Sequence, residues 1–387
     1  MTWLFLSPEF PPNYHLFAWN LKLLGGVATG IGGPPLHHLP PHVAQSLHHY
    51  ESVGDLHHTD VVMKAVHALV HAVGPLQGVD SFNEYWLALE ARIRDELNLP
   101  GPRSADLPAF QQKSMMKTYF QRAGIEPIPG TLAKDFHEIE AFVEKHGFPI
   151  IAKPDKGVGS ASTYRLSNQD QLQQFRLVFR PGYLIEKFIT GTIQTYDGLV
   201  DREGKIIFAA SMEYSKGVAE VVNEDSDIFY YVQREIPSDL SEIGPKIVQE
   251  YGIRARFFHF EFIRSSEGRL YPLEVNMRPP GYPSIDLFNF AHDIDLYKLW
   301  AAVILGQPID PLPPPKYYAC YISRKHSIGY SHTHEEVIRR LQPKLLYEAP
   351  TNPLFRAAMG DHHYVIRTTD KDEMLELASF AQKRLTL

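Results

Sequence analysis

The chain has 387 residues and a net charge of −7, and its hydrophobic and charged fractions of 44% and 21% are those of an ordinary globular protein. This composition excludes disordered, collagen-like and disulfide-scaffold proteins, and the acidic balance argues against nucleic acid as a partner. The length predicts two or three domains. No apolar run reaches the roughly 18 residues of a transmembrane helix, so a membrane is not expected as a partner either.

The single cysteine, Cys320, excludes a disulfide within the chain and a thiolate metal cluster. It lies in an apolar and aromatic run, which favours a buried structural thiol over a nucleophile. The N-terminus lacks a basic segment and is predicted to be a strand rather than a signal peptide. A reducing cytoplasm is therefore the expected compartment.

Residues 1–105 alternate strand-like and helix-like segments, which predicts a Rossmann-like domain with a parallel sheet. The expected elements are a strand over 3–6, helices over 14–24 and about 60–73, a strand end at 78–80 and a helix over 83–98. The turn-forming residues 98–102 predict a domain boundary.

Histidine is concentrated at the N-terminal end, where residues 37–71 hold nine of the chain's 19. His67 and His71 are four residues apart on a predicted helix, a spacing that can place two imidazoles on one metal ion. A third ligand is missing from this pattern, so a solvated helix face is the favoured interpretation. A histidine-rich metal-binding protein is the alternative.

The rest of the chain continues the mixed pattern. Helices are expected over 109–123 and 135–146, and an apolar strand over 149–152. A proline-rich connector over 306–315 precedes a strand over 317–322, a helix over 335–341, a strand over 363–368 and a helix over 372–385. This tail predicts a small α+β unit.

A glycine- and serine-rich segment, 157–162, follows Lys153 at the end of a predicted strand. Its backbone N–H groups are unshielded and can close over phosphate oxygens, while the lysine supplies a positive charge to the same oxygens. The segment is neither a Walker loop nor a Rossmann fingerprint, and a glycine-rich hairpin turn is the alternative.

Two runs, 257–264 and 269–277, flank Ser265-Ser266-Glu267-Gly268 and predict a β-hairpin. Pairing Arg264 with Arg269 places one apolar face toward the core. The pairs on that face are Phe258 with Val275, Phe260 with Leu273 and Phe262 with Tyr271, while His259 falls opposite Glu274 and Glu261 opposite Pro272 on the other face.

That other face therefore carries Glu261, Glu274 and Asn276. Two carboxylates and an amide oxygen held at strand spacing repel one another unless a cation lies between them. Hard oxygen ligands of this kind suit Mg²⁺ or Mn²⁺ that also binds phosphate. The alternative is a solvent-facing hairpin with ordinary polar residues.

In this order, the segments resemble the ATP-grasp superfamily over roughly residues 75–305. The matching pieces are 98–102, Lys113 with 118–125, 127–129, 148–154, the Gly157-Val158-Gly159-Ser160 loop, 185–191, 260–262 and 273–278. The resemblance implies an N-terminal α/β (pre-ATP-grasp) domain at 1–105 and a two-lobed ATP-grasp domain at 106–310. The small lobe is expected at about 120–190, the large lobe at about 191–310, and a C-terminal α+β subdomain at 311–387.

The resemblance also assigns site residues. Lys113 and Lys153 would contact the ATP phosphates, and residues 157–162, with Gly157, Gly159 and Ser160, would form the flexible loop above them. Glu186, Lys187 and Ile189 would line the adenine hinge, and Glu261, Glu274 and Asn276 would hold magnesium. Arg278 would be the catalytic residue that faces the acyl phosphate or the substrate carboxylate. The family often has a carboxylate for the ribose where this chain offers only Gln194. The segment 279–283 is rich in proline, whereas many family members have glycines at this place.

Arg254 and Arg256 precede the predicted metal-binding strand and are candidates for binding an anionic group of the substrate, with a solvated turn as the alternative.

The function that the resemblance implies is ligation of a small carboxylate to a small amine, or a thiol, with amino acids among the fitting substrates. ATP and Mg²⁺ (or Mn²⁺) are the implied cofactors, an acyl phosphate the implied intermediate, and a homodimer one assembly that it allows. The alternatives are a carboxylase that activates bicarbonate, as in biotin carboxylases or purine-pathway carboxylases, and a non-catalytic nucleotide-binding scaffold.

Overall fold

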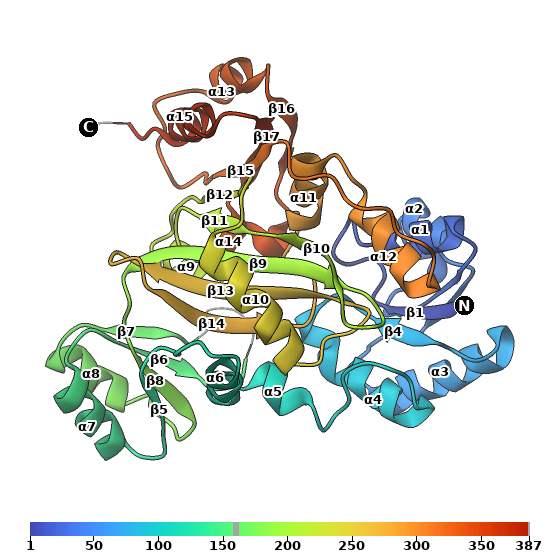
Figure 1. The fold of residues 1–387 in the computed structure, drawn as a ribbon, viewed down its shortest axis with the longest axis horizontal. Helices are drawn as coiled ribbons and strands as arrows, with labels where there is room; N and C mark the ends of the chain where they lie inside the picture. Colours follow the sequence, from blue (N-terminus) through green and yellow to red (C-terminus); the bar gives the residue numbers. More distant parts are fainter. Residues whose placement is uncertain (158–161, 386–387) are drawn as a thin grey trace.

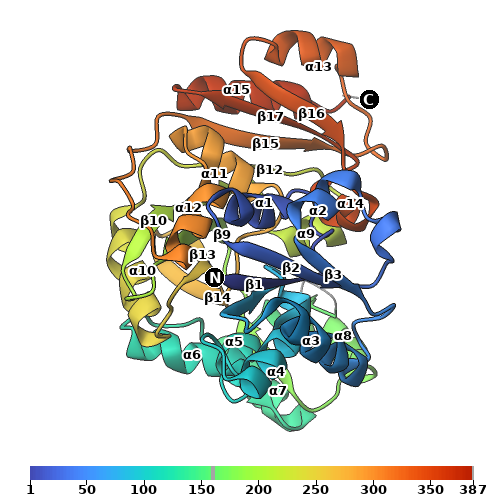
Figure 2. The same cartoon turned by 90° about the vertical axis from the view of Figure 1, so that its right-hand side faces the viewer.

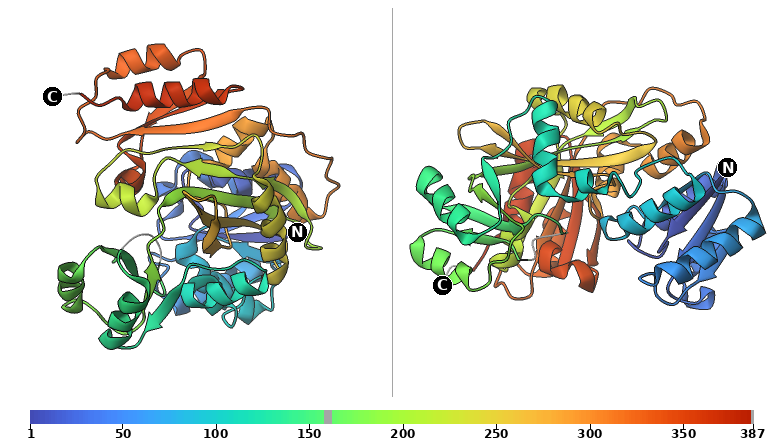
Figure 3. Two further views of the ribbon diagram at one scale, coloured as in Figure 1. Left: turned by 60° about the vertical axis from the view of Figure 1, so that its left-hand side comes forward. Right: turned by 90° about the horizontal axis from the view of Figure 1, so that it is seen from below.

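The computed structural model describes residues 1–157 and 162–385. It has an N-terminal domain, a small lobe and a large lobe whose main sheet continues into the C-terminal residues (Figure 1). The N-terminal domain and the small lobe lie at opposite ends of the molecule when it is seen from below (Figure 3, right). Within the described residues, none of the helices combines the length and the apolar character that crossing a bilayer requires.

The N-terminal domain is Rossmann-like, as predicted. Four parallel strands, β1 (Thr2–Leu6), β2 (Val27–Gly32), β3 (His49–Ser52) and β4 (Gly78–Asp80), form a sheet in the order β3-β2-β1-β4. The helices α1 (His15–Leu23), α2 (Pro41–Ser46), α3 (Thr59–Val73) and α4 (Leu87–Leu97) accompany this sheet (Figure 2). His67 and His71 lie exposed on α3, in agreement with the solvated face.

The sequence prediction missed β2, α2 and β3. Strand β2 is rich in glycine, which is usually a turn signal, but its glycines make room for neighbouring side chains. A Cβ atom at Gly30 would lie 2.8 Å from Leu47 Cδ1, and one at Gly32 would lie 2.5 Å from Tyr50 Oη. These glycines therefore serve close packing inside a buried strand.

The small lobe is a four-stranded antiparallel sheet with a core of its own. Strands β5 (Gly130–Ala133), β6 (Ile150–Pro154), β7 (Tyr164–Leu166) and β8 (Tyr183–Lys187) are ordered β5-β8-β6-β7, and helices α7 (Phe136–His146) and α8 (Gln169–Arg176) pack against them. The Asp135 side chain caps α7 by accepting from Glu138 N. The predicted strand at 149–152 and helix at 135–146 are confirmed.

The single helix expected over 109–123 is wrong. The chain forms α5 (Leu107–Gln111) and α6 (Lys113–Arg122), and Gln112 between them is extended and bridges Lys156. The first amides of α6 find their partners outside the helix: Lys113 N donates to Asp155 O at 2.9 Å and Ser114 N to Asp155 Oδ1 at 2.7 Å. This tertiary capping begins a new helix at Lys113 and ties it to the segment after β6.

The large lobe is built on a nine-stranded sheet in the order β14-β13-β9-β11-β12-β15-β17-β16, with β10 beside β9. Its strands are β9 (Gly191–Val200), β10 (Ile206–Ala210), β11 (Met212–Tyr214), β12 (Phe229–Val232), β13 (Arg256–Ser265), β14 (Leu270–Asn276), β15 (Tyr318–Arg324), β16 (Leu345–Pro350) and β17 (His362–Thr368). The helices in this part are α9 (Val218–Asn223), α10 (Ser238–Glu250), α11 (Ser284–His292), α12 (Leu296–Leu305), α13 (His334–Leu341), α14 (Arg356–Met359) and α15 (Lys371–Gln382).

The C-terminal α+β unit therefore extends the large sheet through β12 and β15 instead of forming a separate sheet. Strand β16 was missed by the sequence prediction. The domain boundaries near 105 and 310 stay predictions. Cys320 lies fully buried in β15, as predicted, and burial raises the pKa of its thiol.

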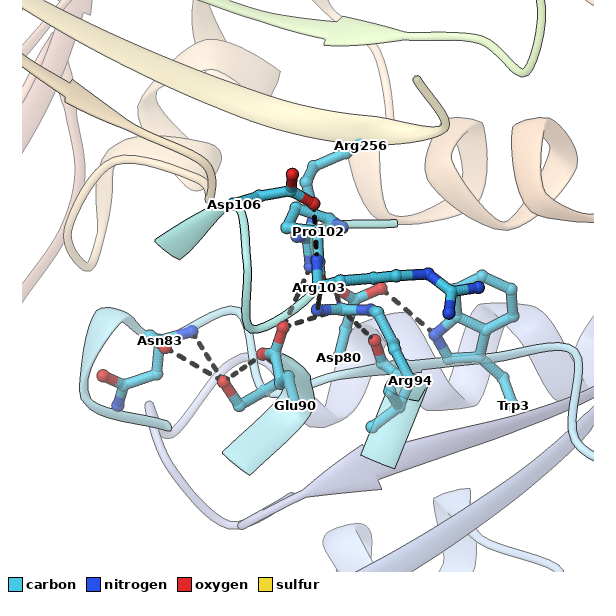
Figure 4. A network of polar contacts seen from close by, with 11 residues as sticks. Trp3, Asp80, Asn83, Glu90, Arg94, Pro102, Arg103, Asp106 and Arg256 are labelled. Carbon is cyan, nitrogen blue, oxygen red and sulfur yellow. Dashed lines mark hydrogen bonds and ion pairs between the residues drawn. The ribbon is translucent and has the colours of Figure 1, made fainter. Parts of the chain in front are cut away.

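A buried charge network joins the N-terminal domain to the large lobe (Figure 4). Arg256, at the start of β13, donates to Asp80 and, at 3.0 Å, to Glu90 Oε2, and Arg94 Nη2 lies 2.7 Å from the same Glu90 oxygen. Burial opposes a charge on Arg256, but the two carboxylates outweigh it and raise the pKa of the guanidinium. Arg256 is thus held in a structural network, and the sequence-based assignment of Arg256 to an anionic substrate is wrong. Arg254 instead donates to the Glu203 carbonyl at 2.6 Å.

Candidate active site

The β13–β14 hairpin places its acidic residues directly opposite one another. Glu261 pairs with Glu274, and His259 pairs with Asn276, all on one face. Phe260 pairs with Val275 on the other face, and both are fully buried. The predicted division into an apolar face and an acidic face holds here.

The predicted register, however, is one residue off at Arg264 and two residues off at Glu261. A bulge between Glu261 and Phe262 sets Phe262 opposite Pro272, and Arg264 pairs with Leu270 where Arg269 was expected. Proline has no N–H group for the ladder, which is why strands accept it at bulges. The bulge shifts Glu274 to the position opposite Glu261, so the two carboxylates lie closer than predicted.

A buried histidine holds Glu261 from behind. His259 Nδ1 lies 2.6 Å from Asp197 Oδ1 on β9, and its Nε2 lies 3.0 Å from Glu261 Oε1. Burial disfavours the charged imidazole, but the two carboxylates outweigh this and raise the pKa of His259 to about 9. Thr195 donates to Asp197 on the far side. The charged imidazolium therefore fixes the orientation of Glu261 through both of its ring nitrogens.

Two cations border the acidic face. Lys113 Nζ lies 3.5 Å from Glu274 Oε1 and donates to the Gly157 carbonyl at 3.1 Å. Arg278 Nη2 lies 3.4 Å from Asn276 Oδ1. Burial alone would raise the pKa of Glu261, yet His259, Arg278 and Lys113 together lower it. The face thus carries the ionised Glu261, with positive charge at its edges.

The small lobe adds a second charged group near the hinge. Glu186 on β8 is buried between two lysines: Lys153 Nζ lies 2.5 Å from Oε2, and Lys117 contacts Oε1. Burial opposes ionisation of Glu186, but the lysines outweigh it and lower the pKa of the carboxyl. Lys117 also donates to the Ile128 carbonyl at 2.6 Å, and burial lowers its pKa. The sequence prediction named Glu186 and Lys153 but missed Lys117.

The segment between β8 and β9 connects the two lobes. Lys187 ends β8 with an exposed side chain, Ile189 is half-buried, and Gly191 begins β9. Lys187 N donates to the Pro129 carbonyl at 3.0 Å. This is the place where the prediction put the adenine hinge. Gly159 and Ser160 of the predicted phosphate loop lie outside the described residues.

Gln194 does not join the cluster. It pairs with Phe262 on β13 and therefore lies on the face opposite Glu261. Its amide is buried and engaged at both ends, since it donates to Glu213 Oε2 at 2.9 Å and accepts from Arg264 Nε at 2.8 Å. Gln194 is thus held on the face away from Glu261, and its contact with the ribose stays a prediction.

Glu84, from the N-terminal domain, is a site residue that the sequence prediction missed. Its Oε2 lies 3.8 Å from Arg278 Nε, and the side chain is 13% exposed. Burial raises the pKa of this carboxyl to about 7, although Arg278 pulls in the opposite direction. A carboxylate and a guanidinium from different domains therefore meet beside the acidic face.

The donor set fits a hard divalent cation. Two carboxylates opposite one another and an amide oxygen one pair along are oxygen ligands of the kind that Mg²⁺ uses with phosphate. Lys113 at the edge of this face suits phosphate oxygens. An antiparallel small lobe, a hinge and a large sheet that carries the acidic face define a two-lobed nucleotide-binding fold.

Comparison with known protein families gives one match within the chain. Residues 146–283 match the family described as the ATP-grasp domain. This part of the chain is similar to the ATP-grasp domain, and the match supports the resemblance to the ATP-grasp superfamily.

Relatives support the same assignment. An L-arginine-specific L-amino acid ligase from Bacillus subtilis is 24% identical over 255 residues, which are 62% of this chain and 59% of that protein. The match thus spans less than two thirds of this relative's length. The crystal structure of an L-amino acid ligase from Bacillus licheniformis superposes with a TM-score of 0.73 at 16% identity, covering 97% of this chain and 95% of the other.

A third similar protein is the biotin carboxylase domain dimer of the 2-oxoglutarate carboxylase from Hydrogenobacter thermophilus, solved with MgADP, ADP and bicarbonate. Its TM-score is 0.68 at 15% identity, and the alignment covers 95% of this chain and 86% of that one. At these identities, the two structural matches establish the fold.

Proposed function

We propose that the protein is an ATP-dependent ligase that joins a carboxylate to an amine through an acyl phosphate and releases ADP and phosphate. The observation that carries this proposal is the pairing of Glu261 with Glu274 beside Asn276, with Lys113 and Arg278 at the edges. A non-catalytic scaffold has no need of paired carboxylates, which repel each other without a cation. The L-amino acid ligases among the similar proteins support the same reaction class.

Each residue has a role in this proposal. Glu261, Glu274 and Asn276 would hold Mg²⁺, which when bound neutralises charge on the phosphate oxygens. Lys113 is placed to reach the same oxygens, because it already spans Glu274 and Gly157. His259 keeps Glu261 ionised and oriented.

At the hinge, Lys153 and Lys117 are held by Glu186 and supply positive charge close to the position of the nucleotide. Lys187 and Ile189 would line the adenine.

In the reaction, a substrate carboxylate oxygen attacks the γ-phosphorus and ADP leaves. The amine nitrogen then attacks the acyl carbon, and phosphate leaves while the nitrogen loses a proton. The protein's part is positioning and neutralisation of charge.

Arg278 and Glu84 support amino acids as substrates. A guanidinium is a partner for a substrate carboxylate, and a buried carboxylate 3.8 Å from it is a partner for a substrate ammonium. An amino acid carries both groups, whereas bicarbonate carries no cation for Glu84. An arriving ammonium would also favour the ionised form of Glu84, whose pKa lies at about 7 without it.

The test is ADP release by the purified full chain with Mg²⁺ and a matrix of amino-acid pairs that includes arginine, with bicarbonate in a separate arm. Turnover that needs a particular pair, with the dipeptide seen by mass spectrometry, supports the proposal. Turnover with bicarbonate alone supports the carboxylase, and absence of ATP binding supports the scaffold. The cytoplasm and a homodimer stay predictions, the latter open to sedimentation.

A further inference from the structure

Three metal-ligating side chains meet in the C-terminal part of the chain, on elements that carry none of the proposed ATP-site residues. His334 begins α13, Glu348 lies on β16, and His362 begins β17. One ligand atom from each lies within 4.8 Å of the other two. Helix α13 lies beside β16 and β17 at the end of the molecule that is far from the small lobe (Figures 1 and 2). Among the described residues this is the one such group of three, and the histidine-rich segment 37–71 forms none.

Regular structure holds all three positions. In the β16–β17 ladder Glu348 pairs with Tyr364 and Pro350 pairs with His362, so Glu348, His362 and Tyr364 share one face. His334 is fixed by the capping box that Thr333 forms with Glu336 at the start of α13. Val337 and Leu341 of α13 pack in the same cluster as Tyr364. The three ligands thus come from two adjacent strands and the helix packed on them.

The contacts between these side chains are not those of a simple ion pair. His362 contacts Glu348 Oε2, yet within the described structure its Nε2 is shielded from solvent and makes no aligned hydrogen bond. His334 Nε2 lies 3.9 Å from the same carboxylate oxygen. Both imidazoles thus approach the same carboxylate oxygen, an arrangement that a shared cation would hold together.

Tyr364 provides the outer support that metal-binding histidines usually have. Its hydroxyl lies 2.7 Å from His334 Nδ1. When Nδ1–H donates to that oxygen, the lone pair of Nε2 is free and faces Glu348.

We propose that His334, Glu348 and His362 form a site for Zn²⁺ or a similar first-row transition-metal ion. Two imidazoles and one carboxylate are an established zinc set that leaves a fourth position for water. Ligand atoms in a tetrahedral zinc site are about 3.3 Å apart, because the bonds are about 2.0 Å long. The present ligand atoms all lie within 4.8 Å of one another, which is close to that spacing. The side chains are 22% to 42% exposed, which leaves the ion an entry path.

Bound zinc would join α13 to the edge of the large sheet. The proposal does not depend on ligase activity, since no residue of the acidic face takes part. Imidazole ligands also separate this site from the oxygen-only set at Glu261 and Glu274, because nitrogen ligands favour zinc over magnesium.

The experiment uses the full chain, stripped with a chelator and kept in excess Mg²⁺. Zn²⁺ alone is titrated calorimetrically, the retained metal is counted after desalting, and thermal melts are recorded with and without Zn²⁺. Cobalt substitution then reports the ligands through its visible absorption. We expect one tight equivalent in the parent and a higher melting temperature with zinc.

His334→Gln and His362→Gln should each lose that equivalent and the zinc-dependent rise in melting temperature. Tyr364→Phe should weaken binding about 10-fold, as loss of an outer partner does. His67→Gln is the matched control in the histidine-rich segment and should bind as the parent does. His334 is 42% exposed, so its variant is expected to fold even where the His362 variant fails. Absence of a tight equivalent in the parent, or an equivalent that survives both histidine changes, would overturn the proposal.

Discussion

Replacing Glu274 by Gln tests whether this residue is a metal ligand or a structural residue. Glu274 Oε1 lies 3.5 Å from Lys113 Nζ, and at an effective dielectric constant of about 20 this attraction is about 5 kcal/mol. Glu261 lies directly opposite, and across about 5 Å of strand pairing the repulsion is about 3 kcal/mol.

Solvent reduces both terms. The side chains of Glu274 and Glu261 are 29% and 34% exposed, and pairs with such exposure contribute only about 1 kcal/mol. The substitution removes one attraction and one repulsion of similar size, so the free energy of unfolding should change by no more than about 1 kcal/mol. For a chain of 387 residues this is a shift in melting temperature of about 1 °C.

Turnover should behave differently. Loss of even an outer partner of a metal ligand costs 10- to 100-fold, so loss of a charged ligand should lower Mg²⁺-dependent ADP release by at least about 100-fold. Thermal melts in EDTA and ADP release across a Mg²⁺ titration measure the two effects separately. Glu267→Gln makes the same chemical change at the exposed turn of the same hairpin and serves as the control.

A Glu274→Gln protein that melts several degrees lower in EDTA but turns over normally would refute the reasoning. Glu274 would then be a structural residue, and the assignment of Mg²⁺ to this face would fall with it.

Further predictions concern the charged groups around this face. Arg256→Ala leaves the buried Asp80 and Glu90 with Arg94 but without their second guanidinium. It should cost about 3–5 kcal/mol, a drop of about 4–6 °C, and Asp80→Asn in that background should recover part of it by calorimetry. Glu84 has a raised pKa, so the parent should lose stability as pH rises from about 4.5 to about 7. In urea unfolding, Glu84→Gln should lack this slope, and an unchanged slope would contradict the burial argument. Glu186 has a lowered pKa, so its stabilisation is present above the unfolded pKa and lost on acidification. Glu186→Gln should therefore be less stable at neutral pH yet lose less stability below about pH 4.5, and an acid limb as steep as the parent's would argue against it.

Sequence reasoning worked where local signals suffice. Asp135 is a typical N-cap residue and marks the start of α7. The alternation of polar and apolar residues around Glu261 separates an acidic face of the hairpin from an apolar one. Sequence reasoning failed where a contact with a distant part of the chain determines the local structure. Gln112 breaks a helix because Asp155 supplies the next one with a cap, and no periodicity shows this.

The candidate site follows the same rule. The hairpin itself carries the three oxygen donors Glu261, Glu274 and Asn276, so the alternation along it was enough to predict that they share one face. Glu84 and Lys117 reach the site from other elements, and only the fold shows that they face Arg278 and Glu186. His334 and His362 are likewise separated along the chain by β16, a strand that the sequence prediction did not contain.

The order of strands in the large sheet bears on how the chain is made. Strand β12 pairs with β11 on one side and with β15 on the other. Because β15 begins at Tyr318, it is synthesised well after β12, whose second edge stays unpaired in the meantime. Until that stretch has left the ribosome, the open edge of β12 exposes Tyr230 and Tyr231, both of which end up buried. An unpaired apolar edge is a template for another chain. Nascent chains, and any version cut before Tyr318, should therefore need a chaperone that covers this edge.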